Sequence, residues 1–430
     1  MRLFVLFLFT LTLPVLLMAQ REGCRSAEYR RAAIDRDPAL GRAVQQVEEF
    51  THTILSRTRP VVVTGTPGSS AAPSGGNVAG PMITIPVVVH VVYNAGVQNI
   101  SDAQVASQIA VLNRDYRKLN ADTAQIPAYY RELAADCGIR FALADLDTNG
   151  NATTGIVRKH TNANSFTYDD AVKYTSRGGD DAWDRDRYLN LWVCNLANGV
   201  LGYSSVPGCA KAVDGVVLHF TAVGTNGTAQ APFNLGRTAT HEIGHWLNLI
   251  HIWGDRDCGD DDVEDTPQQS KATRGDPSGI IFSCGNTPYG NLYMDYMDFT
   301  DDKGMHLFTK GQKERMRTLF ATGGVREALL HSTVVTKPFT DDTPVAVTPV
   351  EAVSLSLYPN PAVQSVQVVT KDASAIGALL EVYDQRGQLV MRSRIMSANM
   401  QLNVGNLSGG VYFLRIKDGG QHAPAKLIKM

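Results

Sequence analysis

The stretch that decides the fold of this chain is residues 241–251, which read His-Glu-Ile-Gly-His-Trp-Leu-Asn-Leu-Ile-His. On a helix, His241 and His245 lie on one face, one turn apart, so both imidazoles reach one metal ion. His251 reaches the same ion only if the chain leaves the helix at about Asn248 and turns back. Three imidazoles leave the fourth position of a zinc ion open for water, as in catalytic sites. The stretch therefore predicts one catalytic zinc ion held by these three histidines.

Glu242 follows the first histidine, where a carboxylate takes a proton from a metal-bound water. The same H-E-x-x-H pattern also arises by chance on amphipathic helices, and Ile243, Leu247 and Ile250 supply an apolar face here. A third histidine at this offset favours the metal site over such a helix. Glu242 is therefore the predicted general base.

The histidine motif resembles the zinc motif of the metzincin proteases, which a methionine turn completes. Trp246, the Trp253-Gly254 pair and residues 263–267, Val-Glu-Asp-Thr-Pro, are similar to the pappalysin branch of that group. Asn248 stands where the family has a glycine, and asparagine is the next best residue for a left-handed turn. The resemblance implies an α+β fold with a twisted mixed sheet, an active-site helix and a C-terminal subdomain containing the methionine turn.

Residues 291–297, Asn-Leu-Tyr-Met-Asp-Tyr-Met, match the methionine-turn motif with Met294 as its methionine. The resemblance implies that Met294 forms an apolar floor beneath the histidines. It also places Tyr296 beside the metal, where its hydroxyl would stabilise the oxyanion of the tetrahedral intermediate. The alternative for Tyr296 is an ordinary core aromatic residue.

Residues 1–19 read as a secretory signal peptide, because Arg2 precedes an apolar run from Leu3 to Met18 that ends at Ala19. The alternative is a membrane anchor, but the run is shorter than the ~20 residues of a membrane span. Residues 20–59 are charged, read as helical and look like a pro-peptide. In the resembled family, a cysteine in the position of Cys24 occupies the open zinc site of the zymogen; a free or disulfide-bonded Cys24 is the alternative. Residues 60–80, rich in Gly, Ser and Pro, form the expected activation segment.

Export permits disulfides, but sequence alone does not fix how six cysteines pair. The resemblance suggests that Cys258 pairs with Cys284, which would clamp the loop between the zinc helix and the methionine turn. Cys194 and Cys209 are a second candidate pair, and Cys137 remains unassigned.

The loop after the zinc helix, residues 255–265, is crowded with carboxylates, which repel one another unless a cation neutralises them. The resembled family has calcium sites here, so Asp261, Asp265 and Thr266 are the candidate ligands. The alternative is a solvated acidic loop.

The next loop, residues 266–290, walls the pocket for the residue after the scissile bond in metzincins. Asp276 is its candidate specificity residue, through a charge-assisted pair with Arg or Lys in the substrate. The alternative is a turn-forming aspartate before Pro277.

The catalytic domain is expected over residues 81–333. Residues 85–93 predict a buried strand in which His90 is structural, and Ser101 predicts a helix N-cap with Gln104 completing a capping box. The strand at 214–220 is the candidate edge for binding an extended substrate, with an ordinary core strand as the alternative. The polar stretch 162–186 predicts a surface loop.

A linker is expected over residues 334–350, followed over 351–430 by short alternating strands that predict a small β-sandwich. Its Y-P-N-P opening and its L-x-x-G-V-Y-F-L-R-I stretch resemble the C-terminal sorting domain of type IX secretion. A substrate- or carbohydrate-binding module is the alternative.

Composition sets the remaining bounds: 44% hydrophobic residues indicate a globular chain, and a net charge of −2 indicates no nucleic-acid partner. No segment of the mature chain is expected to span a membrane. The predicted function is a zinc endopeptidase that is made as a zymogen and acts on proteins or peptides. We expect the type IX machinery to export it through periplasm and outer membrane. The exported protein would then be released or stay attached to the cell surface. An exported binding or adhesion protein that has lost activity is the alternative, supported by Asn248 alone.

Overall fold

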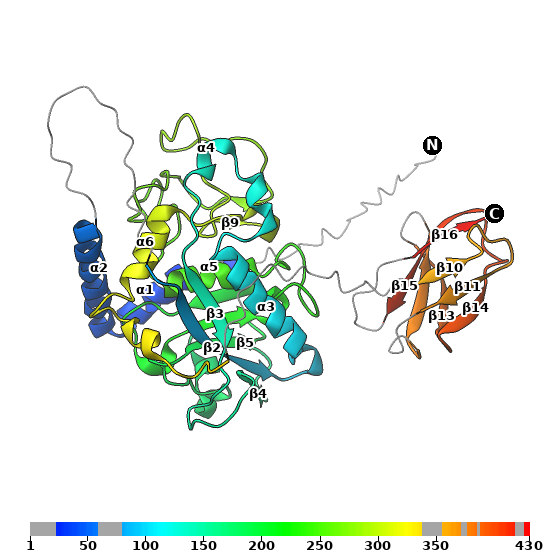
Figure 1. Ribbon diagram of the computed structural model, residues 1–430, viewed down its shortest axis with the longest axis horizontal. Coiled ribbons are helices and arrows are strands. Elements are labelled where there is room, and N and C mark those ends of the chain that lie inside the picture. Colours follow the sequence, from blue (N-terminus) through cyan, green and yellow to red (C-terminus); the bar gives the residue numbers. More distant parts are fainter. Residues whose placement is uncertain (1–22, 59–79, 338–354, 371–375, 385–387, 418–424) are drawn as a thin grey trace, which may run out of the picture.

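The computed structural model describes residues 23–58, 80–337, 355–370, 376–384, 388–417 and 425–430 (Figure 1). The expected signal peptide, nearly all of the activation segment and most of the linker lie outside these residues. The described residues form an α+β unit up to residue 337 and an all-β unit from residue 355, each with a hydrophobic core of its own.

The α+β unit is built on a seven-stranded mixed sheet of order β1-β6-β7-β5-β2-β3, in which β4 also pairs with β2. Its strands are β1 (Gly23–Cys24), β2 (Ile83–Tyr93), β3 (Ile139–Leu143), β4 (Ile156–His160), β5 (Leu189–Cys194), β6 (Val200–Ser204) and β7 (Val216–His219). β2, β3, β4, β5 and β7 run parallel, and β6 runs antiparallel to β7. The nearly continuous β-branched run of β2 suits a strand that is buried on both faces.

The prediction that residues 214–220 form the substrate-binding edge is wrong, because β7 lies between β5 and β6. At this end of the sheet, β6 is the outermost strand contributed by the expected catalytic domain. The short strand β1, which belongs to the expected pro-peptide, pairs with β6 in parallel orientation.

Helices pack around the sheet of the α+β unit (Figure 1). They are α1 (Ser26–Arg36), α2 (Pro38–Thr58), α3 (Asp102–Asp115), α4 (Ala128–Arg131), α5 (Arg237–Trp246) and α6 (Lys310–Thr318). Short 3-10 turns connect them: η1 (Gly96–Gln98), η2 (Ala121–Gln125), η3 (Ala171–Lys173), η4 (Thr175–Arg177), η5 (Lys211–Val213), η6 (Phe220–Ala222), η7 (Asp302–Gly304) and η8 (Glu327–His331). A two-stranded ladder joins β8 (Arg274–Gly275) to β9 (Phe299–Thr300).

The predicted N-cap of α3 is confirmed, since Ser101 Oγ accepts from the Gln104 backbone N–H at 3.1 Å. The Gln104 side chain has a different role from the predicted one. It is buried and donates to Val223 O and Thr228 Oγ1, both at 3.0 Å. It therefore anchors the segment that precedes α5.

The main core lies between the sheet and α3, α5 and α6. A second, more aromatic cluster covers the other face of the sheet and includes Trp192. Segment 162–186, predicted as a surface loop, contributes buried Phe166 and Val172 to that cluster. His90 is fully buried between Asp180 and Asn190, which confirms its structural role.

The predicted Cys258–Cys284 disulfide is present, with an S–S distance of 2.07 Å. The Cys194–Cys209 pair is wrong: both are buried free thiols, as is Cys137. Cys194 ends β5 inside the aromatic cluster, whereas Cys209 lies in the loop between β6 and β7.

The all-β unit is a sandwich of two antiparallel sheets, which confirms the predicted architecture. One sheet has the order β10-β11-β14 and the other β13-β12-β15-β16. The strands are β10 (Ser356–Tyr358), β11 (Ser365–Val369), β12 (Leu379–Tyr383), β13 (Leu389–Arg394), β14 (Asn399–Asn403), β15 (Gly410–Lys417) and β16 (Ala425–Lys429). Alternate residues of β11 and β16 are buried, as the sequence pattern predicts. Across the described parts of both units, no helix combines the length and apolar character needed to cross a bilayer.

Candidate active site

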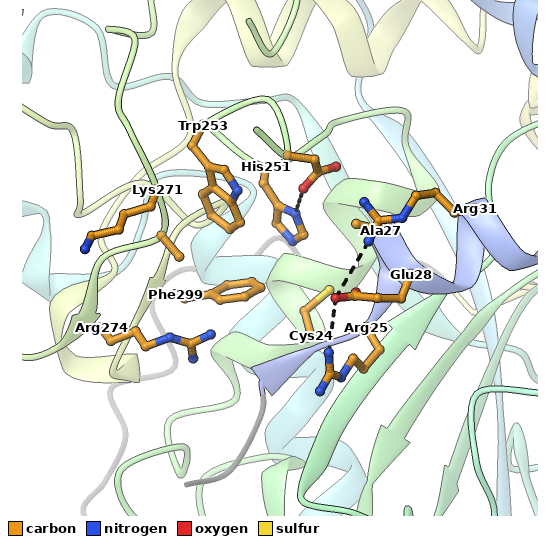
Figure 2. Close-up of a pocket in the computed structure, with 12 residues that line it drawn as sticks. Cys24, Arg25, Ala27, Glu28, Arg31, His251, Trp253, Lys271, Arg274 and Phe299 are labelled. Carbon is orange, nitrogen blue, oxygen red and sulfur yellow. Dashed lines mark hydrogen bonds and ion pairs between the residues drawn. The ribbon is translucent and has the colours of Figure 1, made fainter. Parts of the chain in front are cut away.

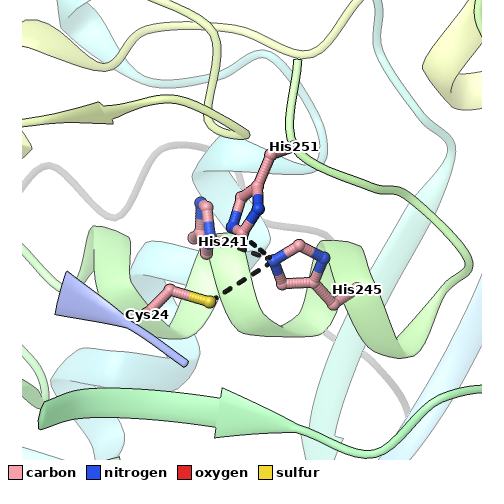
Figure 3. Close-up of side chains that lie close together, drawn as sticks. All are labelled: Cys24, His241, His245 and His251. Carbon is pink, nitrogen blue, oxygen red and sulfur yellow. Dashed lines mark hydrogen bonds between the residues drawn. The ribbon is translucent and has the colours of Figure 1, made fainter. Parts of the chain in front are cut away.

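Three histidines converge beside the sheet, as the sequence predicts (Figure 3). His241 and His245 project from α5, which ends at Trp246. The chain then reverses at Asn248, whose φ of 73° is the left-handed conformation expected there. As a result, His245 Nε2 lies 3.1 Å from both His241 Nε2 and His251 Nε2.

Each imidazole is oriented by an oxygen that faces its other nitrogen. His241 Nδ1 donates to Tyr296 O at 2.6 Å, His245 Nδ1 to Leu249 O at 2.9 Å, and His251 Nδ1 to the Asp255 carboxylate. With the hydrogens on Nδ1, three Nε2 lone pairs face one another. This donor set fits a divalent cation such as zinc. The sequence prediction missed Asp255, although a carboxylate four residues after a ligand histidine was a usable signal.

Burial keeps the rings of His241 and His245 neutral. It lowers the pKa of His241 to about 3, with a further contribution from the neighbouring His251. Burial and the same neighbour also hold the pKa of His245 well below its usual range. Neutral imidazole is the form that binds a metal.

Glu242 lies beside these rings and is fully buried. Its Oε2 accepts a hydrogen bond from Ser26 Oγ at 2.7 Å and from Cys24 Sγ at 3.5 Å. Burial raises its pKa to about 8. A Cβ on Gly202 of β6 would lie 2.9 Å from the Glu242 side chain, so the β6 backbone passes directly over the carboxylate.

Cys24 lies at the point where the histidines converge (Figure 3). Its Sγ is 3.4 Å from His245 Nε2, and its sulfur and one nitrogen of each histidine all lie within 4.8 Å of one another. The β1–β6 ladder pairs Cys24 with Gly202 and so fixes the thiol above α5.

The predicted floor residue, Met294, is wrong. Met294 packs in a separate cluster with Tyr130 and Leu307. Met297 packs in the main core with α5, and its Sδ lies 2.5 Å from the position of a Cβ on Gly244. The sequence offers two registers three residues apart, Met294-Asp295-Tyr296 and Met297-Asp298-Phe299, and the fold uses the second.

The same shift in register removes Tyr296 from the metal site. Its backbone oxygen faces His241, so its side chain points away and packs against Phe308 with the two rings tilted. The hydroxyl is fully buried, and burial together with the nearby Asp115 charge raises the Tyr296 pKa well above its usual range. Phe299 takes the place beside the histidines, with its ring centroid 5.6 Å from that of His241 and 4.8 Å from that of His251.

The remaining predicted residues lie apart from the histidines. Asp276 is 47% exposed and forms an ion pair with Lys303 at 2.5 Å, and it lines neither cavity beside the histidines. Asp261 Oδ1 accepts from Thr266 Oγ1 at 2.7 Å. Asp265 instead accepts from Thr309 and Gly311 at the start of α6.

The mixed sheet, the helix with two histidines, the third histidine after a turn and the methionine turn beneath them define a metalloprotease domain of the metzincin type. The sequence profile described as pregnancy-associated plasma protein-A matches residues 173–321. An extracellular metalloprotease of Pyricularia oryzae is 33% identical over 56% of this chain and 75% of its own length.

Two solved structures resemble the chain more closely. Tannerella forsythia mature mirolysin in complex with a cleaved peptide is 49% identical, covers 60% of this chain and 100% of its own, and has a TM-score of 0.59. A promirolysin mutant from the same organism is 42% identical over 74% of this chain and 100% of its own, with a TM-score of 0.64. The chain therefore belongs to the pappalysin family of metzincins and is a secreted metalloprotease.

The profile of the secretion system C-terminal sorting domain matches residues 356–430, which form the sandwich. The type IX sorting domain predicted from the Y-P-N-P opening is thereby confirmed. The protein is exported by that route.

Proposed function

We propose that the chain is the zymogen of a zinc-dependent endopeptidase that hydrolyses peptide bonds in proteins. The observation that carries the proposal is the convergence of three Nε2 atoms beside a buried glutamate. His241, His245 and His251 would hold the zinc ion, which when bound supplies a Lewis acid that polarises a carbonyl and acidifies water.

Residues of the chain transfer the proton, orient the imidazoles and bind the substrate. Glu242 accepts the proton of the attacking water and returns it to the amine nitrogen as the C–N bond breaks. The Asp255 carboxylate and two backbone oxygens keep the imidazoles oriented. The edge of β6 accepts a strand, as its pairing with β1 illustrates, so an extended substrate would bind there by backbone pairing.

Glu242→Ala tests this function. The variant should keep one zinc ion per chain and lose casein and peptide hydrolysis, because the histidines are untouched. Chelator treatment of the wild-type protein should abolish hydrolysis, and added zinc should restore it. Unchanged hydrolysis by Glu242→Ala would exclude the mechanism.

The proposal includes latency imposed by Cys24. The thiol reaches the histidines, and Ser26 covers the general base. The pro-peptide is held in place by Arg315, whose guanidinium contacts both carboxylate oxygens of Glu48 on α2 at 2.8 and 2.7 Å. A thiolate is a good zinc ligand and would fill the open position.

Cys24→Ala in the full chain tests this latency. The variant should hydrolyse a short fluorogenic peptide before the pro-peptide is cut, whereas the wild type should not. Thr53→Ala on the exposed face of α2 is the control and should stay latent. If the uncut Cys24→Ala protein hydrolyses the peptide no faster than the uncut wild type, the thiol does not impose latency.

We also propose that the enzyme prefers Arg or Lys just after the scissile bond. The cavity beside His241 and Glu242 is lined by Asp302, so this acid replaces Asp276 as the candidate. A substrate cation would pair with it. Asp302→Asn should lose the preference in a peptide library, while Asp276→Asn should keep it. Equal cut-site profiles for wild type and Asp302→Asn would contradict this assignment.

We also propose that the chain binds a structural calcium ion, with Asp261 and Asp295 as its candidate ligands. Asp261 and Asp295 are buried, and Oδ2 of each has no hydrogen-bond partner within the described residues. Burial raises the Asp295 pKa well above its usual range, and the charge of Asp261 adds to this shift. Calcium should raise the Tm of the wild type but not of Asp261→Asn. Equal shifts in both proteins would exclude this site.

A further inference from the structure

We propose that Arg274 is a catalytic residue, whose guanidinium binds the carbonyl oxygen of the scissile peptide and the negative charge that develops on it. This inference rests on the proposed peptidase function. Its basis is the position of Arg274 between two cavities, its contact with Phe299 and its unengaged charge.

Of the cavities that the described residues line, two adjoin both Cys24 and a histidine of the cluster. One, of about 460 Å³, lies beside His251 and Trp253 (Figure 2). The other lies beside His241 and Glu242. Three described residues line both cavities: Cys24, Phe299 and Arg274.

Cys24 belongs to the pro-peptide and marks the position that a substrate would take. Phe299 and Arg274 are therefore the walls that the catalytic domain contributes at that position. In Figure 2 the Arg274 side chain points toward the Phe299 ring, and Cys24 lies on the far side of that ring.

The site needs a hydrogen-bond donor for the oxyanion, and Phe299 cannot supply one. Its carbon ring packs against His241 and His251. The hydroxyl of Tyr296 lies in the core next to Asp115, on the other side of the turn. The Thr300 hydroxyl, which lines the cavity beside Glu242, already donates to Tyr293 O at 3.1 Å.

The backbone and side chain of Arg274 are held by Phe299, but no acidic residue pairs with its charge among the described residues. The β8–β9 ladder pairs Arg274 with Phe299. Its guanidinium carbon lies 5.1 Å from the centroid of the Phe299 ring, a cation–π contact that orients the side chain. Within the described ranges its guanidinium has neither a hydrogen-bond nor an ion-pair partner, so its N–H groups remain available to a substrate.

The chemistry follows from this position. As the water oxygen bonds to the carbonyl carbon, the π pair of the C=O bond moves onto oxygen, and Glu242 takes the proton. Guanidinium N–H groups aimed at that oxygen bind it more strongly as its charge grows, so they lower the barrier rather than improve substrate binding. When the C–N bond breaks, the pair returns to the carbonyl and Glu242 protonates the amine.

The test uses mature, zinc-loaded enzyme. Arg274→Ala should lower kcat about 100-fold with little change in KM, because loss of one oxyanion donor typically costs about 10²–10³ in kcat. Zinc content and Tm should stay unchanged. Lys271 is the other cation that the catalytic domain contributes to the His251 cavity, and it does not line the cavity beside Glu242. Lys271→Ala should therefore keep the wild-type kcat. The double variant Arg274→Ala/Phe299→Tyr should recover part of the activity that Arg274→Ala loses, because the tyrosine adds a hydroxyl beside the histidines.

A second measurement does not depend on turnover. A phosphinic peptide, which carries a tetrahedral anion, should bind Arg274→Ala far more weakly than wild type. An uncleaved peptide should bind Glu242→Ala and Glu242→Ala/Arg274→Ala about equally. Wild-type kcat in Arg274→Ala, or an equal loss in Lys271→Ala, would overturn the role of Arg274 alone. A wild-type enzyme that neither cleaves peptides nor binds the phosphinic peptide would overturn the peptidase proposal and this inference with it.

Discussion

At the scale of single residues, the third histidine depends on Asn248. Its φ of 73° reverses the chain after α5, and a side chain other than glycine in this conformation costs free energy. Asparagine tolerates the left-handed region better than most residues. The substitution of the family glycine therefore preserves the turn, and it lends no support to a protein that has lost its catalytic site.

Asn248→Ala should lower the free energy of unfolding by about 1 kcal/mol, because alanine adopts a positive φ less readily. Asn248→Gly should fold with wild-type stability and bind zinc equally well. Thermal unfolding and metal titration of the three proteins check both statements. An alanine variant as stable as wild type would show that the turn imposes no such cost.

Asp122 provides a pH-dependent prediction. Burial raises its pKa, but the neighbouring His306 ring and the charge of Arg237 outweigh burial and lower it to about 2. A carboxylate whose pKa is lower in the folded than in the unfolded state stabilises the fold above about pH 4 and loses that contribution as pH falls to about 2. The contribution is about 2 kcal/mol at neutral pH.

Asp122→Asn should therefore lower the free energy of unfolding of the metal-free protein at pH 7 by about 2 kcal/mol. The difference from wild type should shrink between pH 4 and pH 2. Denaturant unfolding across this range measures it. A difference that is constant with pH would mean that ionisation of Asp122 does not stabilise the fold.

At the scale of elements, helix α5 and the methionine turn are packed against each other without space between them. Gly244 faces Met297, and a Cβ there would lie 2.5 Å from the methionine sulfur. The glycine is thus required by the turn, although alanine is the better helix former.

Gly244→Ala should lower the Tm, with a loss of about 1–3 kcal/mol from overpacking. Adding Met297→Ala makes room for the new methyl group, so the double variant should lose less than the sum of the two single changes. Thermal unfolding of all four proteins completes this cycle. A higher Tm for Gly244→Ala would show that helix propensity outweighs the contact.

At the scale of the whole molecule, the peptidase and the sorting domain have separate cores. The matched sorting domain begins at residue 356, beyond every residue of the candidate active site. The two activities of the chain, proteolysis and export, should therefore separate genetically.

Deleting residues 356–430 should leave the peptidase unit folded and active once its pro-peptide is cut, but the protein should stay in the periplasm instead of reaching the medium. Fractionation followed by peptide hydrolysis measures both properties. The full-length Glu242→Ala protein is the control, since it should be exported without activity. Export of the truncated protein would contradict the role of the sandwich.

Local patterns determined much of this protein from sequence alone. The spacing of His241, His245 and His251, the position of Glu242 and the strand alternation after residue 355 depend on helix and strand periodicity, which sequence displays directly. The family resemblance supplied the Cys258–Cys284 pair, which the structure contains.

Only the tertiary structure decided what depends on packing between distant segments. Two methionine–aspartate–aromatic triplets compete for one turn, and contact between Met297 and Gly244 selects the second. Strand order, which no single strand encodes, makes β6 rather than β7 the edge. The ladder between β8 and β9 brings Arg274 to Phe299 beside the metal ligands. Such contacts join residues far apart in the chain, so local pattern could not have fixed them.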